Sequence, residues 1–233
     1  MGSSRTLAAS RTSSCSPTCS TSTIRCLSLS DELAATLAQV RELSERYKSG
    51  GSDAFDAFRD LVSLILNATV LHSHSAVRLS YGQGPDLVLG GWDGPTDPLR
   101  LMDGNHLRLS IALYREETPE GPRVKVRASS FQYQLDPEGE RWIFRYDYLR
   151  NPPAPYPACH LQIRGTLIEA GGPHLERVHF PTHRVSIEAV IRLLIEEFGV
   201  RSRTEPDFWR AVLAESEAAF LDIHHRSLSG PNR

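Results

Sequence analysis

The chain has 233 residues, of which 40% are hydrophobic and 23% charged, proportions typical of a globular protein. No apolar run approaches the roughly 20 residues that a membrane-spanning helix needs, so we expect no membrane association. Three arginines and no acidic residue precede Asp31, and the net charge is −2, so the rest of the chain carries about −5. A net-acidic body argues against broad, non-specific binding to nucleic acids or anionic membranes.

Residues 1–29 are rich in Ser, Thr and Arg and have no repeating apolar face. Such a segment buries too little surface to offset its ordering entropy, so we expect it to be disordered. A start codon placed too far upstream explains it equally well, and its composition also fits a targeting segment. Cys15, Cys19 and Cys26 lie here at spacings that match no zinc pair, so a reducing, cytoplasmic setting is expected.

The folded part is predicted to be one domain over residues 30–226, with residues 227–233 fraying. Ser28 and Asp31 form a helix-entry signature, and apolar residues then recur at helical spacing until Gly50. Ser52 is predicted to cap a second helix. Its apolar stripe comprises Phe55, Phe58, Val62, Ile65 and Thr69. Two antiparallel helices joined by a short glycine loop are therefore expected.

From about Ala76 the apolar period changes to two, which indicates strands. Strands are expected around residues 77–81, 86–89, 107–114, 124–128, 131–134, 144–148 and 160–164, and another is expected to end at Phe180. A loop is expected over residues 90–98, with turns at 82–84, 116–121 and 137–139. Consecutive strands joined by short turns form an antiparallel meander.

Two helices are predicted after the strands. One is capped by Ser186 and ended by Gly199, and the next opens with Pro206 inside its first turn. The order of helices, strands and helices predicts an α+β fold. In it, an antiparallel meander is covered on one face by the N-terminal helical hairpin and two C-terminal helices.

No motif of the common enzyme classes is present, whether GxSxG, HExxH, a Walker loop, a dinucleotide fingerprint or paired CxxC. The most suggestive stretch is the strand end from Arg145 to Tyr148. On a strand, Arg145 and Asp147 share one face and the aromatic residues share the other. Arg145 could hold a phosphate that a tyrosine hydroxyl orients. The alternative is a plain ion pair on the solvent face above an aromatic core.

Several histidines follow, and imidazole suits proton transfer at neutral pH. RNA cleavage without a metal needs a base, an acid and a cation, which His160, His179 and Arg145 could supply if the flanking strands are neighbours. The candidate catalytic residues are His160, His179, Arg145, Asp147 and Tyr146, and the candidate binding residues are Arg141, Arg150, Arg164 and His183. Two alternatives stay open: scattered surface histidines, and a metal site of His160, His179, His183 and Asp147, whose spacings match no defined site. No cofactor is expected.

Residues 127–198 resemble TumE-type proteins of bacterial toxin–antitoxin systems. The shared features are Phe131-Gln132-Tyr133, a turn with Gly139, the strand ending Phe144-Arg145-Tyr146-Asp147, a proline-rich link to His160, and a closing helix over 186–198. Where that family has a histidine-rich segment, this chain has Asn151-Pro152-Pro153 and keeps His160. The resemblance implies a toxin–antitoxin or defence component that acts on RNA and has a cognate antitoxin as partner. The alternative is a non-catalytic module that binds a partner protein through the sheet face or the C-terminal helix.

Overall fold

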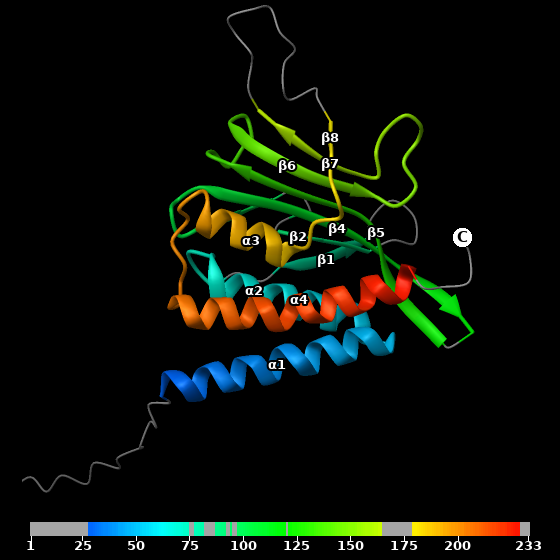
Figure 1. Cartoon of the computed structure of the whole chain (residues 1–233), viewed down its shortest axis with the longest axis horizontal. Coiled ribbons are helices and arrows are strands. Elements are labelled where there is room, and N and C mark those ends of the chain that lie inside the picture. The colour runs from blue at the N-terminus through cyan, green and yellow to red at the C-terminus, as the bar shows by residue number, and fades with distance from the viewer. Residues whose placement is uncertain are drawn as a thin grey trace, which may run out of the picture.

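The computed structural model of the chain describes residues 28–74, 77–81, 87–91, 94, 97–119, 121–164 and 179–228. The predictions for residues 1–27, for the turn at 82–84 and for residues 229–233 lie outside them. In the described residues, eight strands form one antiparallel sheet and four helices lie on one of its faces (Figure 1). The predicted α+β class and the coverage of one face are confirmed.

Helix α1 spans Leu29–Ser49 and begins as predicted. The Ser28 side chain accepts a hydrogen bond from the backbone of Asp31, whose carboxylate accepts one from the backbone of Ser28. Gly50 ends the helix in the left-handed conformation. Helix α2 spans Ala54–Thr69, and the predicted cap at Ser52 is wrong, because Asp53 occupies that position.

The sheet has the order β1-β2-β4-β5-β6-β7-β8, and β3 pairs beside β2 on the same side of β4. Nearly all neighbours in space are therefore neighbours in the chain, which confirms the meander. The strands are β1 Arg78–Tyr81, β2 Leu87–Gly90, β3 Pro98–Arg100, β4 His106–Thr118, β5 Gly121–Gln134, β6 Trp142–Leu149, β7 Cys159–Ile163 and β8 Phe180–Pro181.

The two central strands are longer than predicted. The two strands expected over 124–128 and 131–134 are one strand, β5, and the expected turn at 116–121 is shorter because β4 runs to Thr118 and β5 starts at Gly121. A register shift after Ala112 leaves Arg127 as an extra residue between Val126 and Ala128. This bulge reverses which residues of β5 face the helices and so breaks the apolar alternation in the sequence.

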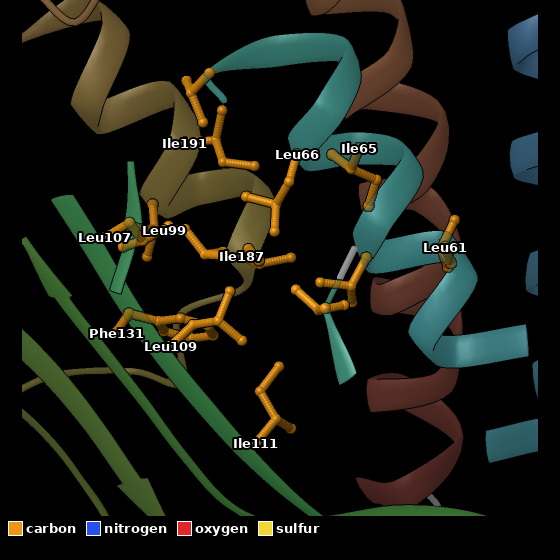
Figure 2. Close-up of a cluster of buried hydrophobic side chains, with 14 of the residues drawn as sticks. Leu61, Ile65, Leu66, Leu99, Leu107, Leu109, Ile111, Phe131, Ile187 and Ile191 are labelled. Atoms are coloured by element: carbon orange, nitrogen blue, oxygen red, sulfur yellow. The ribbon is translucent and has the colours of Figure 1, made fainter. Parts of the chain in front are cut away.

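The main core lies between the sheet and the helices (Figure 2). Leu107, Leu109 and Ile111 of β4 face α2 and α3, and Ile65 and Leu66 of α2 lie opposite them. Helix α3 spans Ile187–Glu196 and is capped by Ser186 as predicted, but it ends before the predicted limit at Phe198. Helix α4 spans Pro206–Leu228 and packs against α1, the outermost helix in Figure 1.

The opposite face of the sheet carries the residues that alternate with the core positions. No described helix lies against this face (Figure 1). Among the described residues, we find no helix with the length and apolar content needed to cross a bilayer. The open face is where the polar residues of β6 and β7 are placed.

Candidate functional site

Strands β6 and β7 bring the polar residues of the site together through their register. Arg145 lies opposite Gln162, and Asp147 lies opposite His160. These four side chains share the open face because they alternate with residues that face the helices. Strand β8 pairs with the far edge of β7, so His179, which directly precedes β8, lies next to the same group.

A carboxylate connects the cation to the first imidazole. Arg145 Nε donates to Asp147 Oδ2 at 2.8 Å, and His160 Nε2 lies 3.5 Å from the same oxygen. Arg145 also donates through Nη2 to the side-chain oxygen of Gln162. These contacts hold the guanidinium on the open face and the Nε2 edge of the His160 ring toward Asp147.

The second imidazole contacts the first. The rings of His160 and His179 are 4.4 Å apart between centroids and meet edge to face. Tyr156, on the loop between β6 and β7, packs edge-on against His179 at 5.4 Å. The Nδ1 atoms of both histidines are buried and have no hydrogen-bond partner among the described residues. A buried polar atom without a partner is costly, so these two nitrogens are points where a ligand or water can bind favourably.

We refer to Arg145, Asp147, His160, Gln162 and His179 as the β6–β8 cluster. The exposed fraction of the side chain falls from 38% for Arg145 to 22% for Asp147 and 13% for His160. The guanidinium therefore reaches solvent while the first imidazole is sheltered. Asp147 is the only carboxylate in the cluster, beside one arginine and two ionisable imidazoles. Such a group can hold an anion and exchange protons with it.

Tyr146 is not brought to the cluster. Strand alternation places it on the helix-facing side, where its ring meets that of Phe144 at 5.6 Å. Burial raises the pKa of Tyr146, so its hydroxyl is held in the neutral form. The structure therefore separates Tyr146 from the Arg145 and Asp147 side chains with which it was grouped.

The four candidate binding residues are also dispersed. Arg141 and Arg164 are exposed, just before β6 and just after β7. Arg150 lies past the other end of β6, where its Nε donates to the carbonyl of Val126 at 3.3 Å. His183 is exposed after β8. Among the described residues, no hydrogen bond or ion pair joins any of these four side chains to the cluster.

Gln162 and Tyr156 were missed as site residues. Gln162 is two residues from His160, and side chains at this spacing on a strand share a face. The sequence therefore contained the signal needed to predict Gln162 as a site residue. Tyr156 stands on a loop whose course no periodic pattern indicates. No group of three or more His, Cys, Asp and Glu side chains in the described part of the chain is placed to hold a metal ion.

Comparisons of the chain with models of known families, with curated proteins and with solved structures gave no match. The function is therefore inferred from the chemistry of the cluster.

Proposed function

We propose that the chain cleaves RNA without a metal ion, through the β6–β8 cluster, as a component of a bacterial toxin–antitoxin or defence module in the cytoplasm. The observation that carries the proposal is the contact between His160 and His179, 4.4 Å apart, beside the guanidinium of Arg145. The resemblance to TumE-type proteins supports the biological setting. It also makes an antitoxin the expected partner.

The cluster contains the groups that the reaction needs. One imidazole accepts the proton of the ribose 2′-hydroxyl while the 2′-oxygen attacks phosphorus. The other imidazole donates a proton to the 5′-oxygen as the P–O5′ bond breaks. The products are a 2′,3′-cyclic phosphate and a 5′-hydroxyl. Arg145 has five N–H donors, of which its contacts with Asp147 and Gln162 use two, so others can bind the phosphate.

Access to the rings requires a local movement. Both Nδ1 atoms are buried, and Asp147 occupies the side of His160 that carries Nε2. Tyr156 is exposed and packs against His179, so displacing this side chain uncovers part of the imidazole pair. RNA bases stack readily on aromatic side chains, which gives Tyr156 a second role in binding an unpaired base.

The proposal is tested with purified protein and a labelled single-stranded RNA in excess EDTA. We expect cleavage that leaves 2′,3′-cyclic phosphate ends. His160→Ala and His179→Ala should each lower the rate by about 100-fold or more, the usual loss for a general acid or base. The matched control is His72→Ala, because His72 is an exposed histidine beside β3, outside the cluster. That variant should retain the full rate.

Two further measurements separate specific cleavage from contamination. RNA with 2′-O-methyl groups should resist the enzyme, because it lacks the attacking hydroxyl. Expression of the chain alone should arrest bacterial growth, and His160→Ala should relieve the arrest. Cleavage that persists in a correctly folded His160→Ala variant, or its absence from the unmodified protein, contradicts the proposal.

A binding role without catalysis is the second candidate. It is favoured by two large apolar side chains, Ile163 of β7 and Phe180 of β8, which are exposed on the same face of these two neighbouring strands. Large apolar side chains gathered at a sheet edge are typical of surfaces that bind partner proteins. In this case expression alone would be harmless, and the product of the neighbouring gene would bind the purified chain. Phe180→Asp should weaken that complex, whereas His160→Ala should leave it unchanged.

A further inference from the structure

A second site lies on the other side of the sheet, inside the helical layer. A cavity is enclosed by residues of the sheet, α1, α2, α4 and the start of α3. Its walls are largely apolar and include Phe58, Leu61, Ile65, Ile111, Val126 and Phe131, several of which Figure 2 shows between α2 and the sheet. The empty space of the cavity is about 710 Å³, a volume that includes solvent at its mouth. The centres of water molecules can occupy about 70 Å³ of this space. A single water needs only about 10–15 Å³ on the latter measure.

An arginine without a carboxylate partner lines this cavity. The guanidinium carbon of Arg184 lies 4.7 Å from the centre of the Tyr148 ring and 5.2 Å from that of Phe220. No ion pair joins Arg184 to an acidic side chain within the described part of the chain. Burial lowers the pKa of Arg184, although arginine stays charged in proteins. A partly buried cation that lacks an anion is unfavourable, and a bound anion would remove that cost.

A carboxyl group faces the same cavity. Glu188 is 4% exposed, and its Oε1 accepts a hydrogen bond from Ser216 at 2.5 Å. Its Oε2 has no hydrogen-bond partner in the described residues. Glu188 belongs to the first turn of α3, whose N-terminal end carries partial positive charge. The polar part of the cavity therefore combines a cation, a helix start and a carboxyl group with an unused atom.

We propose that this cavity binds a small amphipathic carboxylate, with its carboxylate group on Arg184 and its apolar body among the apolar side chains of α2, β4 and β5. Arg184 supplies the charge and the fork of donors that a carboxylate accepts. Protonated Glu188 can donate its hydroxyl to the ligand. The apolar walls exclude water and favour a chain or ring over a hydrophilic anion.

The test measures binding of octanoate and of octan-1-ol to the full chain by calorimetry. These probes share an apolar body and differ in the head group. We expect octanoate to bind at least tenfold more tightly than octan-1-ol. Arg184→Met should remove that preference while octan-1-ol still binds. The control is Arg192→Met, because Arg192 lies in α3, the helix that follows Arg184 in the chain, but pairs with Glu217 and does not line the cavity.

Three results would overturn the proposal: octanoate fails to bind, octanoate binds no better than octan-1-ol, or folded Arg184→Met keeps the full preference. If Arg184→Met does not fold, Arg184→Lys retains the charge and Val126→Phe fills the cavity. The lysine variant should still prefer octanoate, and the phenylalanine variant should lose both ligands. Binding that persists after the cavity is filled places the ligand elsewhere and rejects the site.

Discussion

Glu188 places a carboxyl group in the apolar layer between α3 and α4. Burial raises the pKa of Glu188, and the weaker effect of the hydrogen bond from Ser216 acts in the opposite direction. The proton is therefore held more tightly in the folded chain than in the unfolded chain. At pH values between the ordinary pKa of a glutamate and the raised pKa of Glu188 in the folded chain, folding takes up a proton. The stability that the protonated Glu188 carboxyl provides at low pH is therefore lost as the pH rises.

This linkage predicts the effect of Glu188→Gln. Glutamine cannot ionise, so the variant should lose less stability than the natural chain as the pH rises above the ordinary pKa of a glutamate. A single group can contribute up to about 1.4 kcal/mol per pH unit to this difference. Urea unfolding at several pH values measures it, and Glu197→Gln is the control because Glu197 is exposed and lies directly after the last residue of α3. Parallel pH profiles for the Glu188→Gln variant and the natural chain would contradict the argument.

The residues of the β6–β8 cluster were partly predictable. Arg145, Asp147 and His160 share a face because strand alternation is local and can be counted in the sequence. The same count excludes Tyr146, and the structure places it in the helical layer. His179 was a candidate without a known position, because its place depends on the short pairing of β7 with β8. That pairing is a contact between segments that no local pattern specifies.

At the scale of elements, two helix ends can be compared directly. Gly50 after α1 and Gly199 after α3 have nearly the same left-handed backbone, with φ of 67° and 68°. Their surroundings differ. A Cβ added to Gly50 would lie 1.7 Å from the carbonyl oxygen of Pro122, whereas one added to Gly199 would meet no atom within 4 Å. Gly50 therefore also allows the end of α1 to approach the start of β5.

The comparison predicts different costs for the same substitution. Gly199→Ala should lower the free energy of unfolding by about 1–2 kcal/mol, the cost of the left-handed conformation for a residue with a Cβ. Gly50→Ala should lower it by about 2–5 kcal/mol, because the clash with backbone adds an overpacking term. Chemical denaturation of both variants measures the difference. Equal losses would show that the contact between Gly50 and Pro122 relaxes without cost.

The predicted elements fail where local signals are weak. The caps of α1 and α3 were predictable because Ser28 and Ser186 are followed by clear helical periods. Strand β3 was not predicted, and its first residue, Pro98, was assigned to the loop, because the strand has three residues, begins with proline and follows a stretch rich in glycine and aspartate. Strand β5 was predicted as two strands because of the bulge at Arg127. The apolar residues that face the helices have even numbers before the bulge and odd numbers after it.

At the scale of the molecule, the fold class follows from the order of helices and strands. The order does not show which side chains on the open face are buried. Gln134 is fully buried although no described helix covers its side of the sheet. Its side chain donates to the carbonyl of Asp136 at 2.7 Å, because the loop after β5 folds back over it. Loops of this kind decide which polar residues are sheltered. They carry no periodicity from which their course could be predicted.

The sheet is expected to differ in stability from its centre to its edges. The β4–β5 ladder runs from the pair His106–Gln134 to the pair Thr118–Gly121, whereas β7 and β8 pair at only two positions. Opening the edge breaks few hydrogen bonds and exposes little apolar surface, while opening the centre disrupts the main core. His160 and His179 lie at the weaker edge, where neighbouring groups can be displaced at low cost.

Hydrogen exchange under native conditions tests this gradient. Amides of β4 and β5 over residues 107–111 and 131–133 should exchange most slowly, by openings that approach global unfolding. Amides of residues 159–163 and 179–180 should exchange many times faster. Adding a non-cleavable 2′-O-methyl RNA should slow exchange at this edge and leave the centre unchanged, because binding stabilises only the segment that it contacts. If the edge were as protected as β4 without RNA, the cluster would be part of the rigid core, and the movement of Tyr156 that the catalytic proposal requires would be too costly.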